Sequence, residues 1–258
     1  MKNYCLDVNA PLFVNMGGGY YPAIEFLNID SSFLYASLPF RSRIIKLVAK
    51  MGITSKQAIL LAKTNYKLLR HNLAKGIPLP DNSVDFLYSS HVIEHIPKHL
   101  LNTHLEECYR VLKPDGIYRI VAPDLLVIAK KYSFVAENFD VESKVQDLNE
   151  LNDIASDMFE QMIPVYPKHW ETRPFLLQII LRMMIGDTRR SGDAHTWMYT
   201  STELSWLALN KCRYKSAIKA NFNTSTSPFF QSGFPHDSLD LQLLKPRKNN
   251  SLYLELSK

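Results

Sequence analysis

Hydrophobic and polar positions along the chain follow two patterns, one typical of buried strands and one typical of amphipathic helices. A helix beginning near Pro97 is predicted by an apolar stripe at helical spacing, formed by Leu101, Leu105, Cys108 and Leu112. Apolar runs bounded by turn residues predict strands. These strands are expected at 12–15, 26–29, 68–73, 85–89, 117–123, 214–222 and 251–258.

The order of these elements predicts an α/β fold. A strand, a helix and a second strand follow one another between 85 and 123, which is a βαβ unit and requires a parallel sheet with a right-handed crossover. We expect a single domain over 1–258, with a basic helical insertion at 31–68 and a helical elaboration at 125–200 that caps the substrate. Thr200 and Glu203 have the spacing of a capping box and predict a further helix start.

Composition narrows the functional classes. With 258 residues and 46% hydrophobic residues, the chain can bury a sizeable core. Its three cysteines are far apart in sequence, which argues against a disulfide framework or a cysteine-ligated zinc. No apolar run approaches the roughly 18–20 residues of a membrane span, and the first residues do not resemble a signal peptide. We therefore expect a cytoplasmic protein.

Positive charge is concentrated in one segment. Residues 31–80 hold nine basic side chains and no acidic one, namely Arg41, Arg43, Lys46, Lys50, Lys56, Lys63, Lys67, Arg70 and Lys75. Basic residues opposite an apolar stripe are typical of helices lying on an anionic membrane, although a helix packed on the sheet gives the same pattern. No recognised nucleic-acid module is present, so we expect no nucleic-acid partner.

A glycine-rich turn follows the first predicted strand, and an acid ends the second. Gly17, Gly18 and Gly19 would let the backbone pass close under a ligand, and Asp30 could accept both hydroxyls of a ribose. The dinucleotide motif Gly-x-Gly-x-x-Gly is absent, and Asp30 lies closer to the glycines than the expected spacing of about 20 residues. A nucleoside without a pyrophosphate remains open, as does an ordinary tight turn.

The sequence HVIEH, residues 91–95, has the order of a zinc peptidase motif. That mechanism needs both histidines on one helix, and Pro97 favours a strand end and loop here instead. Two further interpretations stay open. His91, Glu94, His95 and the distant His195 could share a metal, or Glu94 and His95 could bond to backbone at the bend.

Several segments in fixed order resemble a class I S-adenosylmethionine-dependent methyltransferase. They are FVNMGGG with FLNID, then LLRHNLAKGIPLPDNSVDFLYSSHVIEHIP, LEECYRVLKPDGIYRIVAPDL and SLYLELSK. The bacterial subgroup that they resemble is often associated with surface-polysaccharide assembly. The resemblance implies a Rossmann-like sheet of seven mostly parallel strands, with one antiparallel strand. It also implies S-adenosylmethionine lying across the carboxyl ends of the first four strands.

The resemblance assigns expected roles to individual residues. The implied cofactor-binding residues are Gly17, Gly18, Gly19, Asp30, Asn72, Leu73, Ser90 and His91. The family usually has Asp-Leu where this chain has Asn72-Leu73, and the glycine turn is short. A non-catalytic binding or scaffold protein of the same fold is therefore the alternative function, with a metal hydrolase built on HVIEH as a third.

The implied reaction is methylation of a hydroxyl on a sugar or another small or glycan acceptor, which a lipid could carry. Such an acceptor must lose a proton, and the candidates for the base are His195, His91 and Asp124. His195 lies in the polar loop RRSGDAHTWMY, where solvent could equally satisfy it. Asp124 follows a predicted strand and could instead cap the next helix. If 31–68 contacts lipid, the protein would lie at the inner face of the membrane.

Overall fold

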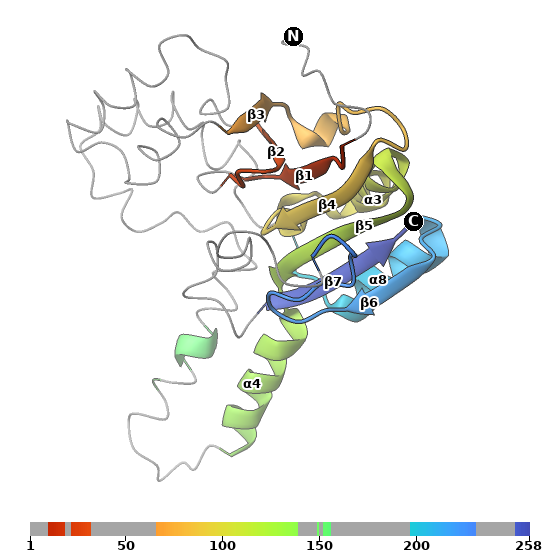
Figure 1. Ribbon diagram of the computed structural model, residues 1–258. Helices are drawn as coiled ribbons and strands as arrows, with labels where there is room; N and C mark the ends of the chain where they lie inside the picture. Colours follow the sequence, from red (N-terminus) through yellow and green to blue (C-terminus); the bar gives the residue numbers. More distant parts are fainter. Residues whose placement is uncertain are drawn as a thin grey trace, which may run out of the picture.

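The computed structural model describes residues 10–18, 22–31, 66–138, 149, 152–155, 197–230 and 251–258. These residues form a seven-stranded sheet in the order β3-β2-β1-β4-β5-β7-β6 (Figure 1). The strands are β1 Phe13–Met16, β2 Leu27–Asp30, β3 Lys67–Arg70, β4 Val84–Ser90, β5 Leu112–Pro123, β6 Ser216–Lys219 and β7 Ser251–Ser257. The α-helices are α3 Leu101–Val111, α4 Leu125–Glu137 and α8 Ser201–Lys211.

Strand direction confirms the predicted architecture. β3, β2, β1, β4 and β5 pair in parallel, whereas β7 runs antiparallel to both β5 and β6. This is the mostly parallel, Rossmann-like sheet that the resemblance implies. Each predicted strand coincides with an observed one to within a few residues. The exception is β5, which begins at Leu112 rather than at 117 because the segment 113–116 bulges between two stretches paired with β4.

One face of the sheet is covered by helices. α3 buries Leu101, Leu105, Cys108 and Val111 against the sheet, so the predicted apolar stripe is confirmed up to the last residue of the helix. α8 packs beside it through Leu204. Its N-cap is Thr200, whose hydroxyl accepts a hydrogen bond from the Glu203 backbone N–H, which confirms the predicted helix start.

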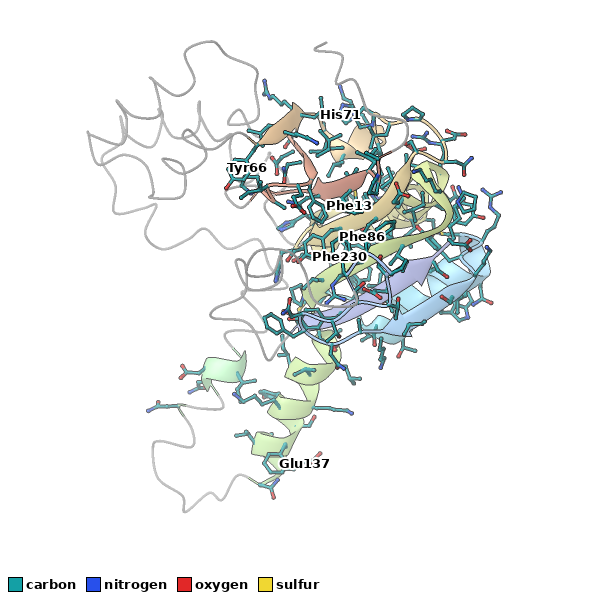
Figure 2. All side chains as sticks on the ribbon, in the orientation of Figure 1. Phe13, Tyr66, His71, Phe86, Glu137 and Phe230 are labelled. Atoms are coloured by element: carbon teal, nitrogen blue, oxygen red, sulfur yellow. The ribbon has the colours of Figure 1, made fainter. Side chains whose placement is uncertain are left out.

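The opposite face carries an aromatic cluster. β1 and β2 are joined by about ten residues, fewer than the dozen or more of a usual parallel crossover. Phe230 packs over this part of the sheet, with ring centroids 5.1 Å from Phe13 and 4.6 Å from Phe86. Figure 2 labels these three rings, which lie side by side on the sheet. Segment 220–230 thus shields apolar surface beside the short connection.

A buried ion pair fastens this segment to the sheet. Arg119 of β5 and Glu255 of β7 lie 3.0 Å apart, and their side chains are almost fully buried. Arg119 also donates to the carbonyl oxygens of Asn221 and Thr224, and Glu255 accepts from the backbone N–H of Thr226. Every contact crosses a large sequence separation, so this pair fixes the path of the chain after β6.

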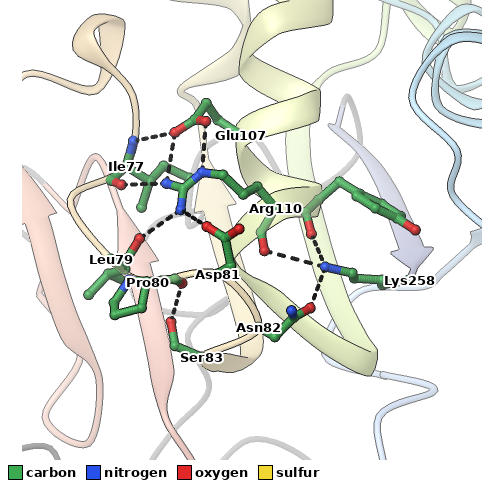
Figure 3. Close-up of polar contacts among 10 residues, drawn as sticks. Ile77, Leu79, Pro80, Asp81, Asn82, Ser83, Glu107, Arg110 and Lys258 are labelled. Carbon is green, nitrogen blue, oxygen red and sulfur yellow. Dashed lines mark hydrogen bonds and ion pairs between the residues drawn. The ribbon is translucent and has the colours of Figure 1, made fainter.

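A second network joins α3 to the loop before β4 (Figure 3). Arg110 makes a two-pronged pair with Glu107 at 2.8 and 2.9 Å. It also donates to the carbonyl oxygens of Ile77 and Leu79 and to the carboxylate of Asp81. Such bidentate geometry is specific to arginine. This network lies within the long sequence block that carries the resemblance. Part of that block therefore serves to hold α3 against the loop before β4, away from the sheet edge described below.

The insertions predicted at 31–68 and 125–200 fall only partly on described residues. α4 confirms a helix at the start of the second segment and projects away from the sheet (Figure 1). Residues 32–65 and 156–196 lie outside the described residues, so the basic helices and most of the cap remain predictions. Within the described ranges, no helix has the length and apolar character needed to cross a membrane.

Candidate functional site

The strand register brings several of the predicted site residues to one edge of the sheet. The last residue of β1, Met16, lies level with Ile29 of β2 and with Ser89 of β4. Parallel strands that end together place the residues that follow them at the same edge, where ligands of open α/β sheets bind. At this edge lie Gly17, Asp30 and Ser90, with His91 next to Ser90.

Gly17 makes the turn at the end of β1. Its φ of 66° lies in the left-handed region, and its N–H donates to the Ile29 carbonyl oxygen at 2.8 Å. A Cβ at this position would lie 2.3 Å from a methyl group of Val92, in the loop after β4. The sequence predicted that glycine leaves room for a ligand. The structure adds another requirement, because glycine lets the loops after β1 and β4 touch.

Gly18 is buried beside Gly17, whereas Gly19 lies outside the described residues. Asp30 ends β2 as a half-buried residue, and its carbonyl oxygen accepts from the His71 N–H at 2.9 Å. A carboxylate at the tip of the second strand, next to the turn after the first, is the acceptor that the two hydroxyls of a ribose require. The geometry at this edge therefore fits the adenosyl part of S-adenosylmethionine.

Asn72 and Leu73 follow β3 at the same edge. The Asn72 side chain accepts a hydrogen bond from the Ala74 N–H at 3.0 Å and caps η2, a short 3-10 helix at Leu73–Lys75. An aspartate could make the same cap, so exchanging aspartate for asparagine here preserves the turn. The predicted contacts of Asn72 and Leu73 with adenine remain a prediction.

His91 lies just beyond β4 in a constrained backbone conformation. Its φ is 54°, which is uncommon for a residue with a side chain, and its N–H donates to the Val121 carbonyl oxygen at 2.9 Å. The next residues form η3, a 3-10 helix at Ile93–His95. The predicted strand end and loop are thus confirmed, and the two histidines of HVIEH are not one turn apart on an α-helix.

Glu94 points its carboxylate at the His91 ring. Oε1 of Glu94 lies 3.0 Å from Nδ1 of His91, and the Glu94 side chain is fully buried. Its backbone carbonyl oxygen accepts from the Trp197 N–H at 3.3 Å. The segment that begins at Trp197 is thereby attached to the loop after β4.

Tyr199 joins this edge from the C-terminal half of the chain. Its backbone forms an isolated parallel β-bridge with Asp124, and its carbonyl oxygen accepts a hydrogen bond from the Leu125 N–H. Burial raises the pKa of Tyr199 to about 12, and the nearby carboxylates of Glu203 and Glu94 contribute to this shift. The hydroxyl therefore stays protonated at neutral pH. Sequence reasoning singled out its loop but missed Tyr199, because a buried tyrosine there has no periodic signal.

Of the three candidate bases, the structure describes His91 and Asp124 but not His195. His91 is at the edge, as described. Asp124 lies at the end of β5, where its carboxylate accepts from the Leu126 N–H at 3.0 Å and caps α4, the predicted alternative role. His195 lies outside the described residues. Within the described ranges, no three His, Cys, Asp or Glu side chains are grouped as a metal site would require.

The chain is similar in sequence to known methyltransferases. Residues 44–120 match the family described as Methyltransferase domain. A probable S-adenosylmethionine-dependent methyltransferase of Mycolicibacterium smegmatis is 29% identical over 99 residues, which are 38% of this chain and 38% of that protein. Both matches are to methyltransferases. The aligned part is well under two thirds of the relative's length.

Solved structures of similar proteins include methyltransferases from several organisms. One from Archaeoglobus fulgidus is 11% identical, with a TM-score of 0.40 over 97% of this chain and 87% of that one. One from Methanosarcina mazei is 16% identical, with a TM-score of 0.42 over 95% and 91% of the two chains. Identities this low indicate nothing about the acceptor.

Proposed function

We propose that this chain is an S-adenosylmethionine-dependent methyltransferase that methylates a hydroxyl of a sugar or another small or glycan acceptor. One observation carries the cofactor assignment. The left-handed turn at Gly17 and the carboxylate of Asp30 end adjacent parallel strands, and the Gly17 N–H is bonded to the residue before Asp30. Gly17 and Gly18 would pass under the methionine and ribose parts, and Asp30 would hold the ribose hydroxyls.

The cofactor carries a methyl group on a sulfonium centre and needs no further chemical activation. The protein's contribution is then to position the acceptor, exclude water and accept a proton. Buried polar atoms at the edge suit this task. Ser90 Oγ has no hydrogen-bond partner among the residues that the structure describes, although the side chain is buried. Buried polar groups are normally paired, which favours a bound ligand here.

Replacing Asp30 by asparagine is expected to weaken binding of S-adenosylmethionine about 10- to 100-fold, because hydrogen bonds to a charged acceptor contribute about 1.5–3 kcal/mol each. Isothermal titration calorimetry measures the effect. Asp115→Asn is the matched control, because Asp115 is exposed, far from the edge and in a left-handed conformation that asparagine tolerates. Equal affinity of both variants would contradict the assignment of Asp30.

A non-catalytic binding protein of the same fold is the second candidate. The short connection between β1 and β2 favours it, because a usual crossover helix does not fit in about ten residues. The same titration separates the two candidates. Absence of heat and of thermal stabilisation at millimolar S-adenosylmethionine would favour the non-catalytic function.

The basic residues and apolar stripe of segment 31–68 motivate a proposal for the acceptor and its location. We propose a glycan acceptor, lipid-linked at the inner face of the membrane, where this segment contacts anionic lipid. Incubation with methyl-labelled S-adenosylmethionine and a cell-envelope extract is expected to give a labelled product that mass spectrometry assigns to a saccharide. Label appearing with soluble metabolites alone, and none with the envelope fraction, would overturn this choice of acceptor.

A further inference from the structure

We propose that Glu94 is a positioning residue that holds His91 as the acceptor of the proton lost by a hydroxyl substrate. This inference rests on the proposed function and goes further, because it assigns the base and limits the substrates to those that lose a proton. It starts from the contact between His91 Nδ1 and Glu94 Oε1, which lie 3.0 Å apart. The Glu94 side chain is 1% exposed, and that of His91 is 19% exposed.

This contact determines which ring nitrogen is available. A carboxylate can only accept a hydrogen bond, so in the neutral imidazole Nδ1 carries the proton and Nε2 carries the lone pair. The backbone that carries the ring is held in place, because His91 has a φ of 54° and its N–H donates to the Val121 carbonyl oxygen. A strained backbone at a strand end is a frequent feature of functional sites.

His91 Nε2 and two other polar atoms near this edge have unsatisfied hydrogen-bonding capacity. His91 Nε2, Ser90 Oγ and Tyr199 Oη are each buried without a hydrogen-bond partner in the part of the chain that the structure describes. They come from the end of β4 and from the segment bridged to the end of β5, which is paired with β4. A substrate hydroxyl bound at His91 would donate its hydrogen bond to Nε2. The arrangement suits a polar acceptor.

The proton and electrons balance in one step. The acceptor oxygen forms a bond to the methyl carbon as the bond from that carbon to sulfur breaks. The electron pair of the broken bond goes to sulfur, which loses its positive charge, and the hydroxyl proton goes to His91 Nε2. The resulting imidazolium lies next to the Glu94 carboxylate, which stabilises it. Solvent then takes the proton.

The test replaces Glu94 by leucine, which removes the acceptor at Nδ1. Protein labelled with ¹⁵N-histidine, with His91→Asn used to assign the signal, is studied by long-range proton–nitrogen correlation. In the wild type we expect neutral His91 to carry its proton on Nδ1, and in Glu94→Leu on Nε2. Transfer of labelled methyl to the envelope extract is expected to fall about 10²- to 10⁴-fold. The dissociation constant of S-adenosylmethionine should stay within about threefold.

Two further variants distinguish loss of the contact between Glu94 and His91 from misfolding. Glu94→Gln keeps the size of the side chain and an oxygen that can accept from Nδ1, so it should keep the tautomer and lose less activity than the leucine variant. Glu106→Leu changes an exposed glutamate of α3 and should leave tautomer and transfer unchanged. Persistence of the Nδ1–H tautomer in Glu94→Leu, or transfer within threefold of the wild type, would overturn the inference. A wild type that binds no S-adenosylmethionine would instead refute the proposed function.

Discussion

Replacing Arg119 by methionine is expected to lower the free energy of unfolding by about 3–5 kcal/mol, measured by urea denaturation. The substitution leaves the Glu255 carboxylate buried without the guanidinium that lies 3.0 Å from it. It also removes the donors to the carbonyl oxygens of Asn221 and Thr224, which hold segment 220–230 against the sheet. The aromatic cluster around Phe230 should then open.

Two controls separate charge from packing. The double variant Arg119→Met with Glu255→Leu removes both buried charges and should recover much of the lost stability, because desolvation offsets most of a buried pair's attraction. Lys215→Met breaks the exposed pair with Asp115 and should leave the urea midpoint unchanged. An Arg119→Met midpoint equal to that of Lys215→Met would show that the buried pair does not hold the segment.

Replacing Gly17 by alanine is expected to destabilise the fold by about 2–4 kcal/mol and to weaken cofactor binding with it. The left-handed conformation alone costs an alanine about 1–2 kcal/mol. The added Cβ would also lie 2.3 Å from the nearest methyl group of Val92, a contact that requires the turn or the loop after β4 to move. Either movement separates the two loops that flank the proposed cofactor position.

A double-mutant cycle with Val92→Ala isolates the steric part. Val92→Ala removes the methyl group that collides, so the double variant should be more stable than the sum of the single losses predicts, by about 1 kcal/mol or more. Thermal and urea unfolding of the four proteins provide the cycle. Strict additivity would indicate that the turn after β1 relaxes freely and that Gly17 is required for its backbone conformation alone.

Local patterns in the sequence predicted the strands of the sheet. They did not predict segment 220–230 and the aromatic cluster on the face opposite the helices. Apolar runs and a helical stripe suffice to place β1, β2, β4 and α3, because each element buries its own periodic residues. Arg119 has no such signal. It stands in the apolar run of β5 and is satisfied by residues about a hundred positions away, a contact that no local pattern reports.

The candidate site likewise contains residues that the sequence could predict and residues that it could not. Gly17 and Asp30 could be predicted because each follows a strand, and the carboxyl ends of parallel strands share an edge. The pairing of His91 with Glu94 could not, since HVIEH also suggests metal ligands, and only the 3-10 turn at Ile93–His95 turns the carboxylate to the ring. The roles of Gly19 and His195 lie on residues outside the described ranges and remain predictions.

The proposed function requires that the turn after β1 and the acid ending β2 together hold an adenosyl group. A crystal structure of the protein with S-adenosylhomocysteine tests it most directly. We expect both ribose hydroxyls within hydrogen-bond distance of the Asp30 carboxylate, with the Gly17–Gly18 backbone beneath the ligand. Density for the ligand at another edge of the sheet, or an Asp30 carboxylate turned away from the ribose, would contradict it.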